Sequence, residues 1–312
     1  MIHISSIQKA YGSKMNKILI IVPYYGELPK YFRHWLKTCK KNQQLDWLIV
    51  SDDKNEYIKD SLPKNVRYLN LNIDELQERV NKIIGFDFRY FTPYRLCDCR
   101  PFFGMMFEEQ TSKYEFWGWS DIDLLYGDLS VFLNQDRLDK FDKIYNKGHL
   151  SIVKNSRLVN NMIFELISDN QVKRIFSSKY SEGFDERYFN DAFLNKGLKI
   201  MDEKECIDIS PRFYEFRNLN DNNRRVIVSY NNGKVVDSEG KEYPYIHFQK
   251  RKFRCNSIES RSYFISSIGF TNDKLKDNPF RLTKKNISFY LGFIKKHLIP
   301  QHINRIKSKI GK

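Results

Sequence analysis

Residues 17–25 read KILIIVPYY, and the apolar run from Ile18 to Val22 within this stretch decides the fold class. A continuous β-branched run is typical of a strand buried on both faces, as strands of parallel sheets are. Pro23 ends the run, and Pro29 suits the first turn of a helix. Apolar residues then recur at helical spacing, at Tyr31, Phe32, Trp35, Leu36 and Cys39. The fold therefore begins with a strand followed by a helix.

Strands and helices continue to alternate through the first half of the chain. Strands are predicted at 47–50, 66–71 and 114–119, and helices at 74–84 and, opened by Pro101, at 101–110. This order predicts a doubly wound α/β sheet with right-handed crossovers. Ligands of such sheets bind beyond the carboxyl ends of the strands. Two acidic pairs, Asp52-Asp53 and Asp121-x-Asp123, follow predicted strands, so we expect them at one edge of the sheet.

The composition indicates a folded protein with a large core. The chain has 312 residues, of which 41% are hydrophobic and 15% aromatic, far too many for disorder. The first twelve residues contain no apolar run resembling a signal peptide, and no stretch approaches the ~20 apolar residues that span a bilayer. Five cysteines are too few and too scattered for a disulfide framework. A cytoplasmic location is therefore expected.

The net charge of +15 is concentrated near the C-terminus. Residues 281–312 contain nine Lys or Arg and no Asp or Glu, so they supply more than half of the excess. A DNA-binding protein would spread its cations over one face of the main domain, and no nucleic-acid partner is expected. Apolar residues recur at helical spacing among these cations, at Ile287, Tyr290, Leu291, Ile294 and Leu298. The segment can lie on an anionic membrane surface, at the inner face of the cell membrane, or pack on its own domain.

The Asp121-Ile122-Asp123 motif suggests a metal site. In an extended chain alternate side chains project to the same side, which would place both carboxylates together and Ile122 toward the core. Two adjacent carboxylates repel each other unless a cation lies between them, and oxygen ligands suit Mg²⁺ or Mn²⁺. Such an ion could bind a diphosphate and stabilise its charge as it departs. The alternative is a solvated turn or a helix cap.

Three sequence blocks together resemble a known family. FWGWSDIDLLYGDL at 116–129 resembles the Asp-x-Asp signature of bacterial GT-A glycosyltransferases that build capsular and other surface polysaccharides. KILIIVPYY at 17–25 and YIHFQKRK at 245–252 fit the same pattern. The resemblance covers residues 15 to 255. It implies a GT-A-like doubly wound mixed sheet, a Rossmann-like nucleotide-sugar domain, with residues 1–14 as a lead-in and 256–312 as a basic helical extension.

The resemblance also implies a function. It implies a metal-dependent hexosyltransferase that uses Mn²⁺ or Mg²⁺ and moves a sugar from a nucleotide-diphosphate donor, such as a UDP-sugar, to an oligosaccharide or lipid-linked acceptor. Residues expected to contact the donor are Tyr24, Asp52, Asp53, Arg100, Asp121, Lys250 and Lys252. The metal ligands expected are Asp121, Asp123 and His247.

His247 lies in a predicted strand at 245–249. There Ile246 and Phe248 would face the core, while His247 and Gln249 face the opposite side. A lone histidine is usually structural or on the surface. However, a late histidine is a metal ligand in several GT-A families, and the cations that follow His247, from Lys250 to Lys252, would suit a diphosphate.

An acidic segment at 184–195, FDERYFNDAFLN, is the candidate acceptor side. Asp191 lies in an Asn-Asp…Asn spacing similar to that of retaining, glycogenin-like transferases. An inverting enzyme would instead use Asp185, Glu186 or Asp191 as the base toward the acceptor hydroxyl. The helix dipole also favours acidic residues in a first helical turn, which would account for Asp185 and Glu186 without catalysis. Both stereochemical outcomes stay open.

Other classes fit the sequence less well. Cys97-x-Cys99 lacks a second ligand pair for zinc. The motifs GxGxxG and GxxxxGK[ST] are missing from the sequence, which disfavours a Rossmann dehydrogenase and a P-loop NTPase. A nucleotidyltransferase remains the main alternative, although Tyr24-Tyr25-Gly26 is not its usual glycine-rich loop. Turn signals at 231–233 and 238–240 predict a hairpin within 230–243.

Overall fold

The computed structural model describes residues 17–52, 61–166, 168–202, 204–249, 251, 260–267, 269–272 and 279–300. The chain divides into two compact units that interleave along the sequence. The first comprises Met1–Glu27, Asn42–Asp121 and Leu133–Glu203, and the second comprises Leu28–Lys41, Ile122–Phe132 and Lys204–Lys312. The chain passes from the first unit to the second inside the Asp-x-Asp motif. The boundaries expected from the sequence, with one domain over 15–255, stay a prediction.

The first unit is built on a seven-stranded sheet in the order β3-β2-β1-β4-β7-β6-β8. Strand β1 pairs in parallel with both β2 and β4, and β3 is parallel to β2, whereas β7 runs antiparallel to β4 and β6. The strands are β1 Ile18–Pro23, β2 Leu45–Ser51, β3 Val66–Asn70, β4 Phe116–Ser120, β6 Lys143–Ile144, β7 Leu150–Lys154 and β8 Ile200–Met201. The predicted mixed α/β sheet is thus confirmed.

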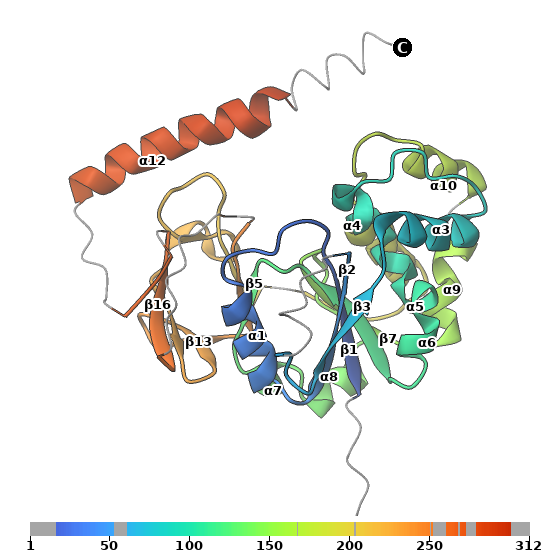
Figure 1. Cartoon of the computed structure of the whole chain (residues 1–312), viewed down its shortest axis with the longest axis horizontal. Helices are drawn as coiled ribbons and strands as arrows, with labels where there is room; N and C mark the ends of the chain where they lie inside the picture. Colours follow the sequence, from blue (N-terminus) through green and yellow to red (C-terminus); the bar gives the residue numbers. More distant parts are fainter. Residues whose placement is uncertain are drawn as a thin grey trace, which may run out of the picture. The chain divides into compact units, whose positions relative to one another are not determined.

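Helices pack against this sheet through one apolar core (Figure 1). Leu19 and Ile21 of β1 belong to that core together with Leu76 and Val80 of α3, and all four side chains are buried. Helix α3 begins with a reciprocal capping box between Asn72 and Glu75, so its first backbone N–H groups are paired. The longer helices are α3 Ile73–Ile84, α8 Gln135–Lys140, α9 Arg157–Leu166, α10 Asp169–Phe176 and α11 Phe189–Asn195.

The segment before β4 differs from the prediction. A single helix was expected over 101–110, but the structure has a series of short turns. Phe107 adopts φ −121° and ψ 35°, outside the helical region, and separates two one-turn helices. The short elements are η1 Pro93–Arg95, α4 Leu96–Cys99, η2 Arg100–Phe102, α5 Phe103–Met106 and α6 Glu108–Thr111. Aromatic packing overrides helix periodicity here, since Phe102, Phe103 and Phe107 are all fully buried.

The second unit contains helix α1 (Phe32–Lys41), the short helices α7 (Leu129–Phe132) and η4 (Leu219–Asp221), and three small sheets. A five-stranded antiparallel sheet has the order β14-β13-β12-β16-β17, and a three-stranded sheet has the order β5-β15-β9. The predicted hairpin is confirmed, because Asn231 pairs with Lys234 across a two-residue turn in which Asn232 and Gly233 have positive φ. The strands are β5 Leu124–Tyr126, β9 Ile207–Asp208, β10 Arg217–Asn218, β11 Arg224–Arg225, β12 Val228–Asn231, β13 Lys234–Asp237, β14 Glu242–Tyr243, β15 Tyr245–His247, β16 Ser262–Ser266 and β17 Gly269–Thr271.

The C-terminal helix predicted from apolar spacing is also confirmed. Helix α12 spans Pro279–Phe293 and continues as a wider π-helical turn, η5, over Ile294–Leu298. Its sequence is basic, as expected for the extension. Among the residues that the structure describes, none of the helices is both long and apolar enough to cross a bilayer.

Candidate functional site

The three-stranded sheet of the second unit brings three titratable side chains together. In the parallel pair of β15 and β9, the register places His247 directly beside Asp208. On the other side of β15, His247 pairs with Leu124, the residue that follows Asp123. The backbone N–H of Phe248 donates to the carbonyl of Asp123 at 2.9 Å, which fixes the end of the motif against β15. Sheet register, rather than a flexible loop, therefore positions all three side chains.

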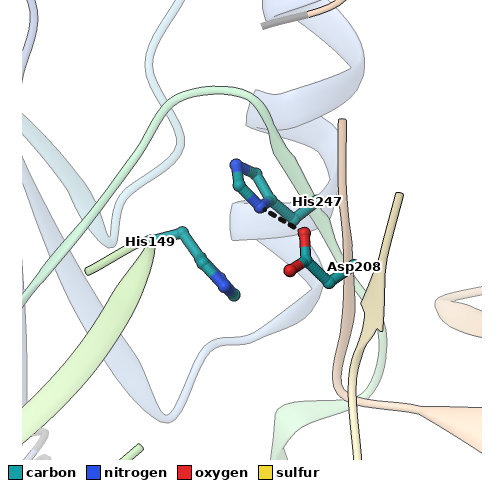
Figure 2. A group of neighbouring side chains, drawn as sticks. All are labelled: His149, Asp208 and His247. Carbon is teal, nitrogen blue, oxygen red and sulfur yellow. Dashed lines mark hydrogen bonds and ion pairs between the residues drawn. The ribbon is translucent and has the colours of Figure 1, made fainter. Parts of the chain in front are cut away.

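The imidazole of His247 lies between the two carboxylates. Its Nδ1 is 2.9 Å from Asp208 Oδ1, the hydrogen bond drawn in Figure 2. Its Nε2 is 3.5 Å from Asp123 Oδ1. Gln249 Nε2 donates to the same Asp208 oxygen at 2.7 Å. The two side chains meet at Asp208, although β15 ends at His247 and not at Gln249 as predicted, and Gln249 has a positive φ of 52°. Asp123, Asp208 and His247 are each only 4–6% exposed.

This environment changes the basicity of His247. Burial alone would lower the pKa of the imidazole, because a charged ring is poorly solvated inside the protein. The negative charge and hydrogen bonding of Asp123, and then of Asp208, outweigh burial and raise the pKa of His247 to about 10. Without a metal ion the ring is therefore an imidazolium that neutralises part of the surrounding negative charge at neutral pH.

The same atoms fit a divalent cation. Ligands at right angles around Mg²⁺ or Mn²⁺, each ~2.1 Å from the ion, lie ~3 Å apart, close to the 3.5 Å between Asp123 Oδ1 and His247 Nε2. When Nδ1–H donates to Asp208, Nε2 carries the lone pair that a metal requires. Metal-bound histidines commonly donate their second N–H to a carboxylate in this way. Asp208 would thus orient His247 without binding the ion itself.

Asp121 also has partners in the first unit. It follows β4 directly, and its backbone N–H donates to the carbonyl of His149, one of the residues drawn in Figure 2, at 2.9 Å. Arg100 forms ion pairs with Asp121 and with Asp185, at 2.7 Å to the latter. The backbone bends at Ile122 and Asp123, so the motif itself is not an extended strand.

Two carboxylates hold Arg100 in its charged form. Burial would lower its pKa, but the charges of Asp121 and Asp185 raise it above its ordinary value. The side chain is 12% exposed and that of Asp185 only 3%. Arg100 was predicted to contact the donor and Asp185 to act at the acceptor side. The structure joins them in one ion-pair chain that ends at Asp121.

Gly148 packs directly against the Arg100–Asp185 ion pair. Its N–H donates to Glu186 Oε1 at 2.7 Å, and its carbonyl accepts from Trp119 Nε1 at 2.8 Å. A Cβ at this position would lie 2.7 Å from both Arg100 Nη1 and Asp185 Oδ2. Real Cβ atoms do not approach heavy atoms so closely, so the close packing of the ion pair depends on glycine.

Two further predicted donor residues, Tyr24 and Asp52, lie at the carboxyl ends of strands in the first unit. Because β1 lies between β2 and β4 and all three are parallel, Asp52 and Asp121 follow strands that end at the same edge, as expected. Asp52 is exposed. The Tyr24 hydroxyl donates to the carbonyl of Glu27 at 3.0 Å. Asp53, Lys250 and Lys252 lie outside the described residues.

On the acceptor side, Asp191 lies in the first turn of α11 and is exposed. Its neighbour Asn190 is engaged with Lys143, whose buried ammonium donates to it at 2.6 Å. Asp185 and Glu186 are committed to Arg100 and Gly148 respectively. Of the three predicted catalytic carboxylates, Asp185 is buried, whereas Glu186 and Asp191 are both exposed.

Sequence reasoning missed Asp208. It lies in a two-residue strand, too short to produce an alternating pattern. The available signal was the segment Ile207-Asp208-Ile209, in which two buried β-branched residues flank an acid. That pattern predicts a polar side chain on the opposite side of a short strand, but the identity of its partner depends on tertiary pairing.

The solved structures that resemble this chain include two glycosyltransferases. The glycosyltransferase GlyE of Streptococcus pneumoniae TIGR4 aligns at a TM-score of 0.37 and 11% identity, over 61% of this chain and 46% of that one. The galactosyltransferase LgtC, solved with donor and acceptor sugar analogues, aligns at a TM-score of 0.36 and 13% identity, over 62% of this chain and 76% of that one. These scores are too low to assign a function.

Sequence comparison gives a family without an assigned activity. None of the curated proteins matches the chain. A family model does match, over residues 20–276, which include both strands that flank the Asp-x-Asp motif as well as Asp208 and His247. The chain belongs to the family described as "Family of unknown function (DUF6625)".

Proposed function

We propose that this protein is a glycosyltransferase that takes a sugar from a nucleotide-diphosphate donor with the help of Mn²⁺ or Mg²⁺. One observation carries the proposal. The Asp-x-Asp motif follows β4, the central strand of the seven-stranded sheet. Its second carboxylate lies 3.5 Å from a buried histidine whose other ring nitrogen is hydrogen-bonded to Asp208. A carboxylate ligand, Asp123, and a histidine ligand, His247, oriented by a second carboxylate, Asp208, match the ligand chemistry of a divalent metal.

In this proposal Asp123 and His247 hold the cation, and Asp121, two residues away along the chain, supplies the second carboxylate. The ion would neutralise the charge that develops on the departing nucleoside diphosphate. Asp208 would favour the tautomer of His247 in which Nε2 carries the lone pair that a metal requires. Lys250 and Lys252, which follow His247 in the sequence, are proposed to contact the diphosphate, because ammonium groups bind phosphate oxygens as point charges.

The nucleoside is proposed to lie at the carboxyl ends of β1 and β2. Tyr24 offers an aromatic ring there, and Asp52 and Asp53 offer acceptors for ribose or base hydrogen bonds. A uridine diphosphate sugar, with hexosyl transfer, is the donor we favour. Arg100 is proposed to contact the donor as well, because it pairs with Asp121 at the end of β4.

The transfer breaks the bond between the anomeric carbon and the diphosphate oxygen and forms a bond to an acceptor hydroxyl, whose proton must pass to a base. Asp191 and Glu186 are both exposed, but Asp185 and Glu186 already accept hydrogen bonds from Arg100 and Gly148. We therefore favour Asp191 as the base or neighbouring carboxylate. The acceptor proposed is an oligosaccharide or lipid-linked sugar of a surface polysaccharide, and either stereochemical outcome is compatible with these residues.

The test is a panel of sugar nucleotides incubated with Mn²⁺ and a mixed set of oligosaccharide acceptors, with the products separated by mass. Glycosyl transfer predicts that a nucleoside diphosphate is released as one acceptor gains a hexose. Release of pyrophosphate with formation of a nucleotide ester would indicate a nucleotidyltransferase and overturn the proposal. Full activity in EDTA would overturn the role of the metal.

A further inference from the structure

Helix α12 has two different sides, one packed on the second unit and one exposed. One face is fixed to the second unit. Asn286 Oδ1 accepts from the backbone N–H groups of Tyr214 and Glu215, at 2.8 and 3.1 Å. The ring of Phe289 packs edge-on against Tyr214. The guanidinium carbon of Arg251 lies over the same ring, 4.9 Å from the ring centroid.

Arg251 ties this contact to the body of the unit. Its guanidinium donates to the carbonyls of Ser210, Phe213 and Tyr214, so the loop that receives α12 is itself cross-linked by hydrogen bonds. Asn286, Phe289 and Phe293 recur at spacings of three and four residues, which places them on one side of the helix. The helix is therefore held along one side.

The other side is apolar and exposed. Ile287 is 57% exposed, Tyr290 43% and Leu291 59%, and Leu298 beyond the π-helical turn is 38% exposed. These residues also recur at spacings of three, four and seven, so they form a stripe that does not overlap the fixed side. We call this stripe, with the lysines named below, the outer face of α12. Exposed apolar stripes of this kind mark interaction surfaces.

Charge indicates what the outer face meets. Lys284 and Lys295 border the stripe at helical spacing, Lys296 follows Lys295, and all three are exposed. Lys285 belongs to the fixed side instead, because its ammonium lies 5.0 Å from the centroid of the Tyr214 ring. The sequence from 279 to 312 contains no acidic residue. Apolar side chains between exposed lysines suit a surface that is negatively charged outside and apolar just beneath, because the lysine stems reach up to the headgroups while the apolar residues enter the acyl boundary.

We propose that the outer face of α12 docks this protein on an anionic lipid bilayer, with the helix lying in the plane of the interface. The fixed side keeps the second unit attached to the helix, so the protein binds as a folded body rather than through a free tail. This inference is independent of the metal site, and the two can fail separately.

The test is co-sedimentation of the full chain with phosphatidylcholine vesicles that contain or lack phosphatidylserine. Binding is expected only with phosphatidylserine, and it should fall steeply as the Debye length shrinks from ~10 Å at 0.1 M salt to ~3 Å at 1 M. The triple variant Lys284→Gln/Lys295→Gln/Lys296→Gln should weaken binding by roughly 100-fold, at about five-fold per lysine.

A matched control carries the same charge change elsewhere. Lys82, Lys154 and Lys173 are exposed lysines of the first unit, and their triple glutamine variant should bind nearly as the unmodified chain does. A second variant, Ile287→Ser/Leu291→Ser, should also release the protein from vesicles while its melting temperature stays unchanged, because both side chains are exposed.

Three results would overturn the proposal. They are equal binding to both kinds of vesicle, no binding to either, or equal losses in the two triple variants. Analytical ultracentrifugation supplies a fourth. If the unmodified chain is a dimer and the Ile287→Ser/Leu291→Ser variant a monomer, a second copy covers the outer face instead of a membrane.

Discussion

Replacing Asp208 by Asn tests the metal site through a residue that would not touch the ion. The change removes a negative charge 2.9 Å from His247 Nδ1 and keeps the size of the side chain. The asparagine oxygen can still accept one hydrogen bond, but it no longer holds the imidazole in one tautomer as strongly. Substitution of such an orienting carboxylate typically weakens metal affinity by ~10–100-fold.

That range gives a measurable stability change. With Mn²⁺ at ~100 times the dissociation constant of the unmodified protein, binding raises the free energy of unfolding by ~2.7 kcal/mol. At the same concentration, a variant that binds ~10-fold more weakly gains ~1.4 kcal/mol, and one that binds ~100-fold more weakly gains ~0.4 kcal/mol. Urea unfolding with and without Mn²⁺ measures this difference, and calorimetry of Mn²⁺ binding checks the affinity directly.

Asp237→Asn is the matched control. Like Asp208, which is 4% exposed, Asp237 is buried, at 6% exposure, and accepts hydrogen bonds. Unlike Asp208, it lies in the five-stranded sheet. The control variant should lose intrinsic stability yet keep the full Mn²⁺ increment. If Asp208→Asn keeps the full increment as well, Asp208 does not orient a metal ligand and the reasoning fails.

Three further predictions follow from the same geometry. Asp123→Ala should abolish both the Mn²⁺ increment and sugar transfer, and retention of either would remove Asp123 from the metal shell. In metal-free protein, protonated His247 stabilises the fold, and this contribution is fully present below pH 6.5, the ordinary pKa of histidine, and is lost as pH rises through about 10. Urea unfolding across that pH range should show the loss of stability in the unmodified chain and little of it in His247→Gln. An equal dependence of unfolding free energy on pH in the two proteins would contradict the assignment. Gly148→Ala should cost ~1–3 kcal/mol of stability, because the new Cβ would displace Arg100 or Asp185, and an unchanged unfolding midpoint would show that the cluster can relax.

The first half of the fold could be predicted because its signals are local. The run Ile18–Val22 is buried throughout, and the strands at 45–51, 66–70 and 116–120 lie where apolar content placed them. Helix α3 carries its own start and stop signals in Asn72 and Gly85. The turn at Asn232-Gly233 needs positive φ, which these residue types tolerate.

The rest depends on contacts between distant residues. The one-helix prediction for 101–110 failed because burial of three phenylalanines determines the backbone there, and periodicity does not report their partners. The interleaving of two units is likewise invisible in a linear pattern, since Leu28–Lys41 belongs with residues far along the chain. Within the site, Asp123 and His247 were expected from the motifs, whereas Asp208 became identifiable only through the register of β15 against β9.

The most direct test of the central claim is calorimetric titration of UDP into the protein with Mn²⁺ and then with EDTA, for the unmodified chain and for Asp123→Ala. The account predicts binding by the unmodified chain in Mn²⁺, little binding in EDTA, and little binding by Asp123→Ala in either condition. Equal UDP affinity with Mn²⁺ and with EDTA, unaffected by loss of Asp123, would contradict a metal-dependent nucleotide-sugar site.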